Sequence, residues 1–480
     1  MSRNERRCGV LMHISSLPAS DSSGSFGSEA RHFVDLLCEG GFKLWQVLPF
    51  CMTDECNSPY KSPCSFGGNP YFIDLPTLYE KGLLTSAELK EAEQESPYLC
   101  EFDRLNRERL ALLRKASERV LDRTPIIEAV KNIPALDGAS SFLALREANG
   151  NAPWQEWTVE SADLDTLFFW QFVQYEFFTQ WMALKAYANE RGISVIGDLP
   201  IYVAADSSDV WADKEQFLLD ADGYPTSVAG VPPDYFSEDG QLWGNPLYNW
   251  KNMKKDGYSW WRRRLEFTLT LFDGVRLDHF RGLESYWSIP QGAKSAKEGK
   301  WVKGPGKSLI NALREVAGDR LIIAEDLGDI TEQVHALRRY AGFPGMRVMQ
   351  FAFLGDRETP HLPHNYEKDC VVYSGTHDNN TLLGYVWELD EATRAELFAY
   401  CGCSGDDWNS ACRSIIRTLL ASHADTVILP IQDIMVFGKD TRMNTPGTNS
   451  SNWAYRLTAK QMMSIDAKKL RLINQLFGRA

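Results

Sequence analysis

Eight short apolar segments recur along the chain, and each ends in polar, glycine or proline residues. Most are almost continuously hydrophobic, a pattern typical of parallel strands that are buried on both faces. The eight segments are residues 8–14, 44–50, 193–201, 274–280, 321–326, 346–353, 370–374 and 426–434. Helical spacing of apolar positions separates several of them, at residues 29–39, 308–316 and 331–340. The pattern therefore predicts strands and helices that alternate along the chain.

Eight strands that alternate with helices are typical of two α/β folds, a closed (β/α)8 barrel and a long doubly wound sheet. Doubly wound folds that bind nucleotides carry a glycine-rich phosphate-binding turn after a strand, and no such turn follows any of the eight segments. We therefore predict a (β/α)8 TIM barrel, with residues 1–480 forming a single barrel domain.

Two connections between the predicted strands are too long to be simple crossovers. Residues 51–165 contain charged segments with helical spacing, at 85–95 and 102–120, and predict a mainly helical insertion. A long aromatic segment at 164–190 predicts the helix that returns to the barrel. Residues 203–271 are rich in Asp, Gly, Pro and aromatic residues, and we expect a loop-rich insertion over the barrel mouth.

The net charge and the apolar runs limit the partners and the compartment. The formal net charge of −13 argues against a nucleic-acid partner, because such proteins carry a concentrated basic surface. The apolar runs are too short, or too often interrupted by polar residues, to span a membrane. The N-terminus leads directly into the first predicted strand and leaves no room for a signal peptide. We therefore expect a cytoplasmic protein.

Cysteine and aromatic contents add two expectations. The ten cysteines are irregularly spaced and do not form the paired pattern of a zinc site. We predict free thiols, which suit a reducing compartment, and no metal ion. Aromatic residues make up 12% of the chain, with 15 Trp and 18 Tyr. Most should pack in the core, but some are candidates to contact a ligand with flat apolar faces, such as a sugar.

Four acidic residues stand at the carboxyl ends of predicted strands, where a barrel places its functional groups. They are Asp198, Asp278, Glu325 and Asp378. A single acid in such a position is usually a helix cap or an ion-pair partner. Several like charges in one barrel mouth cost stability unless the site uses them. Glycoside chemistry needs one ionised carboxylate and one protonated carboxylic acid, so the set points to that chemistry.

The residues around two of these acids suggest different protonation states. Arg276 and Asp278 share one face of their strand, and an arginine favours the ionised carboxylate that a nucleophile needs. The two residues could also form only an internal ion pair. Glu325 follows the apolar residues 322–324, which favour the protonated form of a general acid. Its neighbour Asp326 faces the opposite side and is expected to be a loop or capping residue.

Three sequence blocks surround the acids of the second half of the chain. They are Leu277-Asp278-His279-Phe280-Arg281-Gly282, Ala324-Glu325-Asp326-Leu327-Gly328 and Gly375-Thr376-His377-Asp378-Asn379-Asn380. Further blocks follow in order along nearly the whole chain, at residues 9–17, 45–49, 58–60, 68–70, 197–202, 234–236, 243–248, 446–448 and 452–453. Together they resemble the 4-α-glucanotransferases, also called amylomaltases or disproportionating enzymes.

The resemblance implies roles for nine residues. Asp278 matches the nucleophile, Glu325 the acid/base and Asp378 the carboxylate that grips sugar hydroxyls in the donor site. The other matches are Arg276 and His377, which orient the nucleophile and the donor glucose, and Tyr60, Asp198, Trp243 and Asn245, which contact the substrate. Trp243 could instead pack in the core, and Asn245 could instead brace its loop.

The implied reaction is a retaining transfer through a covalent glycosyl-enzyme. An α-1,4-glucan segment would move from a maltooligosaccharide, or from a starch- or glycogen-type glucan, to the 4-OH of glucose or of another glucan. The two carboxyl groups serve this chemistry without a metal ion or an organic cofactor. The expected partners are these donor and acceptor sugars, and the sequence specifies no oligomeric state.

The chain departs from the family pattern at three places. The turn at residues 20–30 lacks the usual Gly-Ile-Gly-Asp-Leu-Gly, Lys61 stands where many relatives carry Gln, and Ala454 replaces a frequent Arg. These changes bear on the geometry of the first loop and on acceptor preference. None of them touches the catalytic carboxylates.

Two alternatives to a transferase remain open. An α-amylase-like α-1,4-glucan hydrolase uses the same three carboxylates and differs in how well its site excludes water. A non-catalytic glucan-binding protein could keep the barrel, although it would be expected to have lost one of the acids. Maltotriose distinguishes them, because transfer yields glucose and longer oligomers, whereas hydrolysis steadily raises the number of reducing ends.

Overall fold

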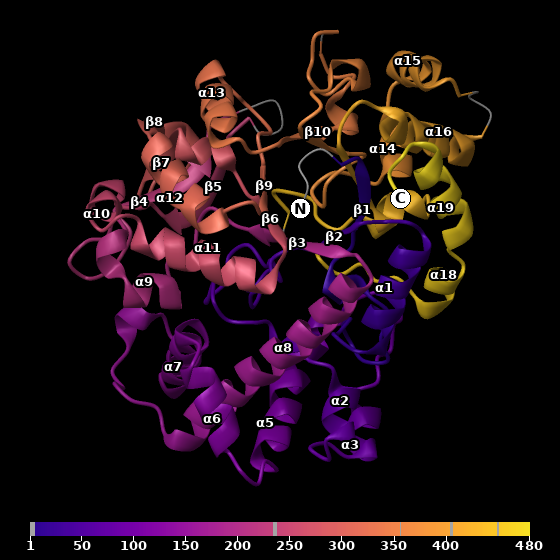
Figure 1. The fold of residues 1–480 in the computed structure, drawn as a ribbon. Helices are drawn as coiled ribbons and strands as arrows, with labels where there is room; N and C mark the ends of the chain where they lie inside the picture. The colour runs from indigo at the N-terminus through magenta and orange to yellow at the C-terminus, as the bar shows by residue number, and fades with distance from the viewer. Residues whose placement is uncertain (1–4, 234–237, 356, 404–406, 449–450) are drawn as a thin grey trace.

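Eight parallel strands, each overlapping one predicted apolar segment, close into a barrel in the computed structural model (Figure 1). The strands are β1 (Arg7–Leu11), β2 (Leu44–Gln46), β3 (Ser194–Leu199), β6 (Gly274–Leu277), β9 (Leu321–Ala324), β10 (Gly345–Val348), β11 (Cys370–Tyr373) and β12 (Thr426–Pro430). Their order around the barrel is β1-β12-β11-β10-β9-β6-β3-β2. The predicted (β/α)8 fold is confirmed. The structure describes residues 5–233, 238–355, 357–403, 407–448 and 451–480.

Each strand is shorter than the apolar segment that predicted it, because the backbone leaves the sheet at the barrel mouth. The fourth segment extends to residue 280, but β6 ends at Leu277. His279, two residues later, has a φ of 45°, a left-handed conformation that no strand residue adopts. The acidic residues of the predicted site therefore lie at the strand ends or just beyond them.

Four predicted helices are present with bounds within one residue of those expected. They are α1 (Ser28–Glu39), α8 (Leu164–Glu190), α12 (Lys307–Ala317) and α13 (Glu332–Ala341). The start of α8 is set by Asp163, whose side chain accepts hydrogen bonds from the backbone N–H groups of Asp165 and Thr166. Buried residues occur on all sides of α8, because it packs between the barrel and the insertion helices.

The chain between β2 and α8 is mainly helical. It contains α2 (Leu75–Glu80), α3 (Ser86–Glu91), α4 (Phe102–Arg104), α5 (Leu110–Glu118), α6 (Thr124–Lys131) and α7 (Pro134–Ala148). The segment expected to be one helix at 102–120 is divided, because Leu105–Arg109 forms a π-helical turn between α4 and α5. α5, α6 and α7 contact α8, and in Figure 1 this group lies below the barrel.

The region expected to be loop-rich, residues 203–271, contains regular structure. Its strands β4 (Ser227–Val231) and β5 (Gln241–Pro246) join β7 (Ser285–Pro290) and β8 (Lys300–Lys303) in an antiparallel sheet of order β5-β4-β7-β8. The region also holds α9 (Ser208–Ala212), α10 (Trp250–Lys255) and α11 (Ser259–Leu271). The block Asp234-Tyr235-Phe236 lies outside the described residues.

All ten cysteines lie in the described part of the chain, and all ten are free thiols. Among the helices of the described residues, none is both long enough and apolar enough to cross a membrane.

Candidate active site

The register of neighbouring strands brings Asp278 and Glu325 together at the barrel mouth. Leu277 at the end of β6 pairs with Ala324 at the end of β9, so Asp278 and Glu325 are the next residues on adjacent strands. The Glu325 N–H donates to the Leu277 carbonyl at 3.0 Å, and the Phe280 N–H donates to the Glu325 carbonyl at 3.0 Å. Neighbouring strands lie about 4.8 Å apart, so the two residues lie side by side at the barrel mouth.

Arg276 joins Asp278 to a second carboxylate, that of Asp198. Its Nη1 lies 2.8 Å from both carboxylate oxygens of Asp198, and its Nη2 lies 3.1 Å from Asp278 Oδ1. The Tyr60 hydroxyl donates to Asp198 Oδ2 at 2.8 Å. The Asp198 side chain is 0% exposed and that of Asp278 is 25% exposed. Asp198 is therefore the internal partner of the arginine, whereas Asp278 faces the mouth.

Electrostatics keep a positive charge beside Asp278. Burial disfavours the charged form of Arg276, but the carboxylates of Asp198 and Asp278 outweigh this effect and raise the pKa of Arg276 well above its usual value. Burial also raises the pKa of Asp198, an effect that Arg276 opposes. Arg276 therefore stays cationic, as the predicted support of an ionised nucleophile requires.

Glu325 lies in the environment expected of a general acid. Burial raises the pKa of Glu325 to about 7, while Arg276 opposes the shift and Asp278 adds to it. Two backbone groups fix its carboxyl, because the His279 N–H donates to Oε2 at 2.7 Å and the Leu327 N–H donates to Oε1 at 3.0 Å. Near neutral pH this group can therefore both give up and take back a proton.

The raised pKa of Glu325 predicts a pH dependence of the first chemical step. The acid form must be present to protonate a leaving sugar, so kcat/KM for a maltooligosaccharide should fall as the pH rises through about 7. An α-glycosyl fluoride needs no proton on its leaving group, so fluoride release should lack this alkaline limb. A maltotriose profile that stays flat to pH 9 would contradict the assignment.

Asp378 and His377 reach the site from the loop that follows β11. Asn444 Nδ2 donates to Asp378 Oδ1 at 2.6 Å, and His377 Nε2 lies 3.4 Å from Asp378 Oδ2. The His377 ring stacks on Tyr60, with ring centroids 5.3 Å apart and an interplanar angle of 14°. Trp453 lies against both rings, at 5.8 Å from Tyr60 and 5.9 Å from His377. The three rings form an aromatic wall beside Asp378 and Asp198.

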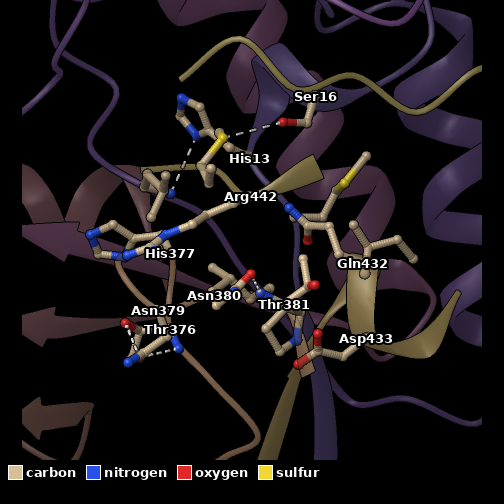
Figure 2. A pocket seen from close by; sticks show the side chains of 16 residues that line it. His13, Ser16, Thr376, His377, Asn379, Asn380, Thr381, Gln432, Asp433 and Arg442 are labelled. Atoms are coloured by element: carbon tan, nitrogen blue, oxygen red, sulfur yellow. Dashed lines mark hydrogen bonds between the residues drawn. The ribbon is translucent and has the colours of Figure 1, made fainter. Parts of the chain in front are cut away.

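A pocket opens next to His377, between the ends of β1, β11 and β12 (Figure 2). The buried His13 lines it, and burial together with the nearby His377 lowers the pKa of His13 to about 3. At its base Asp433 accepts hydrogen bonds from Ser374 Oγ at 2.5 Å and from the Leu382 N–H at 2.7 Å. These two bonds join the two ends of the loop that carries His377 and Asp378.

Trp243 and Asn245 come from β5 of the antiparallel sheet. The Trp243 ring meets the His279 ring edge to face, with centroids 5.0 Å apart, so it lies over the loop that follows Asp278. Asn245 is buried, and its Nδ2 donates to the Val203 carbonyl at 2.8 Å. The amide nitrogen of Asn245 therefore braces its loop, the structural alternative considered for this residue.

Several residues that the structure places in or beside the site were not predicted from the sequence. Asn444, Arg442 and Asp433 contact the Asp378 loop or its ends, and Trp453 completes the aromatic wall. All four follow β12, and for Asp433, Arg442 and Asn444 the signal that could have identified them is a polar residue after a barrel strand. Asp326 lies in the loop after β9, as expected, but it caps no helix and is buried between Arg338 and Arg347.

No group of three or more His, Cys, Asp or Glu residues in the described ranges is arranged to hold a metal ion. The described site is built from carboxyl groups, the arginines Arg276 and Arg442, imidazoles, an amide and aromatic rings. Such a set can stabilise positive charge at a sugar carbon and exchange a proton with an oxygen.

The family profile and the sequence relatives indicate one family. A family profile described as 4-alpha-glucanotransferase, of glycoside hydrolase group 77, matches residues 12–462. A 4-alpha-glucanotransferase of Clostridium butyricum is 41% identical over 492 aligned residues, covering 98% of this chain and all of the relative. The Thermus thermophilus 4-alpha-glucanotransferase is also 41% identical, and 97% of each chain is covered.

Solved structures agree with the sequence relatives. The amylomaltase of Streptococcus agalactiae, solved in complex with acarbose, is 35% identical with a TM-score of 0.94, covering 99% of this chain and 100% of its own. An α-amylase of Geobacillus thermoleovorans is 10% identical with a TM-score of 0.51, covering 100% of this chain and 81% of its own. The second likeness concerns the fold alone.

Proposed function

Because the chain belongs to the 4-alpha-glucanotransferase family, we propose that it transfers α-1,4-glucan segments with Asp278 as nucleophile and Glu325 as acid/base. The donor is a maltooligosaccharide or a starch- or glycogen-type glucan, and the acceptor is the 4-OH of glucose or of another glucan. One observation carries the assignment of roles. The pairing of Leu277 with Ala324 sets Asp278, the partner of Arg276, beside Glu325, whose pKa is raised to about 7.

In the first half of the reaction, Asp278 attacks the anomeric carbon of the donor. The bond from this carbon to the leaving O4 breaks as Glu325 gives its proton to that oxygen, and a glycosyl ester forms on Asp278. Arg276 supports the charge of the nucleophile before attack. A retaining mechanism of this kind requires the two carboxyl groups to lie about 5–5.5 Å apart in the substrate complex.

In the second half, the acceptor sugar takes the place of the departed fragment. Glu325, now ionised, removes the proton of the acceptor 4-OH, and the oxygen attacks the anomeric carbon. The ester bond to Asp278 breaks, and the configuration of the donor is retained after two inversions. The enzyme returns to its starting protonation state, so neither half requires a further reactant.

The remaining site residues hold the donor sugar. Asp378 and His377 bind hydroxyl groups of the donor glucose, and the stacking of His377 on Tyr60 supports a fixed orientation for the imidazole. Asp198 anchors Arg276 and the Tyr60 hydroxyl. Trp243 offers an apolar surface over the loop that follows Asp278. Asn245, on the same strand, ties β5 to the Val203 carbonyl.

Transfer rather than hydrolysis requires water to be kept from the glycosyl ester. We assign this task to the insertion at 203–271, which places β5 and Trp243 against the loop after Asp278. The insertion at 51–165 contributes Tyr60 and supports α8 from outside the barrel. In this proposal residues 1–480 form one catalytic barrel domain with two insertions. The insertion at 203–271 keeps water from the ester, and the insertion at 51–165 supplies Tyr60 and supports α8.

The net charge of the chain bears on its ligands, and its cysteines bear on its location. We propose that neutral glucans, and not nucleic acids or membranes, are the ligands of this acidic chain, which has a formal net charge of −13. A cytoplasmic location is supported by ten free thiols, which a reducing compartment preserves.

The simplest test of the proposal is the product pattern from maltotriose. Transfer should give glucose together with maltopentaose and longer oligomers, and the total number of reducing ends should stay nearly constant, because each bond broken is replaced by a bond formed. Chromatography and a reducing-end assay on the same samples measure both quantities. A steady rise of reducing ends would favour the amylase-like hydrolase, and an unchanged substrate would favour a non-catalytic glucan-binding protein.

A further inference from the structure

The chain that follows β9 is attached to β6 on one side but has little backbone pairing on the other. β9 and β10 pair at a single position, Ala324 with Gly345. The Met346 N–H on β10 donates to Asp326 Oδ1 at 2.7 Å. The side chain of Asp326 thus adds a tie to β10 where the backbone pairing of β9 with β10 stops.

Two buried arginines complete the surroundings of Asp326. Arg338 Nε of α13 lies 3.2 Å from Asp326 Oδ2, and Arg347 Nη1 of β10 lies 3.3 Å from the same oxygen. The Asp326 side chain is 0% exposed. Arg338 Nη2 also lies 2.8 Å from Glu367, whose side chain is 53% exposed. The cluster therefore runs from the protein surface to the residue next to Glu325.

The Asp326 carboxylate lies directly against Gly345 of β10. A Cβ atom on Gly345 would lie 2.4 Å from Asp326 Oδ2, so the glycine lets β10 approach the carboxylate. Buried ion clusters of this kind give little net stability over apolar residues of similar volume. The cluster ties the backbone at Asp326 to β10 and α13, next to the Leu327 N–H that donates to Glu325 Oε1.

We propose that Asp326 is a positioning residue that, by fastening the chain after β9 to β10 and α13, fixes the direction in which Glu325 presents its carboxyl group to the leaving oxygen. The inference rests on the proposed role of Glu325 as acid/base. Asp326 itself touches neither the substrate nor the reacting atoms. Its loss should therefore harm the steps that need a proton from Glu325 more than the attack by Asp278.

Three variants of the full-length enzyme test this inference. Asp326→Asn keeps an acceptor for the Met346 N–H but removes the charge between the arginines. Gly345→Ala removes no charge and only displaces the Asp326 carboxylate, so it tests the inference even if Asp326→Asn fails to fold. Glu367→Gln is the matched control, because it removes a carboxylate from the exposed end of the same cluster. Circular dichroism and thermal melting establish which variants are folded.

Two donors separate a positioning effect from a general structural one. We expect Asp326→Asn and Gly345→Ala to lower transfer from maltotriose about tenfold or more, because part of the general-acid contribution is lost. Single-turnover fluoride release from α-maltosyl fluoride, which needs no proton, should change less than about threefold. Glu367→Gln should leave both rates close to those of the parent enzyme.

Equal losses with both donors, or no loss with either, would overturn the inference. A parent enzyme that transfers nothing from maltotriose, or a Glu325→Gln variant that transfers normally, would instead refute the proposed function itself. The two failures are thus distinguishable.

Discussion

Replacing Asp278 by asparagine should lower transfer from maltotriose by about a thousandfold or more, while the protein still folds and still binds maltooligosaccharides. The amide is nearly isosteric with the carboxylate but cannot form the glycosyl ester. The fold should survive because Asp278 is the partly exposed partner of Arg276, which keeps its two contacts with the buried Asp198. Glucose release and calorimetric titration with a maltooligosaccharide measure the two expected results.

A matched control removes a carboxylate from the same rim of the barrel. Asp329 follows Glu325 by four residues, and its side chain is 70% exposed. Asp329→Asn should change transfer by no more than a few-fold, since the residue takes no part in the proposed chemistry. An Asp278→Asn variant that kept more than a tenth of the parental rate would show that another group is the nucleophile.

Replacing Glu325 by glutamine should lower transfer from maltotriose by about 10²- to 10⁴-fold, the usual contribution of a general acid/base. The carboxamide oxygen can still accept one of the two N–H groups, from His279 or Leu327, and the backbone hydrogen bonds of residue 325 to Leu277 and Phe280 remain, so the loop should keep its shape. With an α-glycosyl fluoride the first step should largely recover, because fluoride leaves without a proton. Stopped-flow detection of fluoride gives the rate of this step.

The second step should stay blocked in the Glu325→Gln variant, because the same residue must act as base for the acceptor hydroxyl. A burst of fluoride equal to the enzyme concentration, followed by slow turnover, is therefore expected. Fluoride release as slow as transfer from maltotriose would mean that Glu325 serves the fold or the nucleophile rather than the leaving group.

The barrel could be predicted from the sequence because its strands carry a strong local signal. Parallel strands covered by helices are apolar on both faces, so most of the eight barrel strands lie in almost continuously apolar runs. The acids were found for a related reason, since a barrel exposes its polar groups where such runs end. Arg276 and Asp278 could be paired from side-chain alternation alone, and the ion pair at 3.1 Å agrees.

The antiparallel sheet over the barrel could not be predicted, because its strands lack such a signal. β8 is largely exposed along its length, and β4 pairs with β7 across more than fifty residues of chain. The ion pairs of Asp326 could not be predicted for a similar reason. Alternation indicates the face on which its side chain lies, but its partners Arg338 and Arg347 belong to α13 and β10. Contacts between distant segments decide such roles, and local periodicity does not report them.

The measurement that tests the proposed chemistry most directly is the mass of the Glu325→Gln protein after exposure to α-maltosyl fluoride. One added maltosyl unit is expected, because Asp278 can still displace fluoride while no base activates an acceptor. Peptide mapping of the digested adduct should place the sugar on Asp278. An adduct on Asp378 or Asp198 would contradict the assigned roles, and the absence of any adduct while fluoride is released would contradict a covalent intermediate.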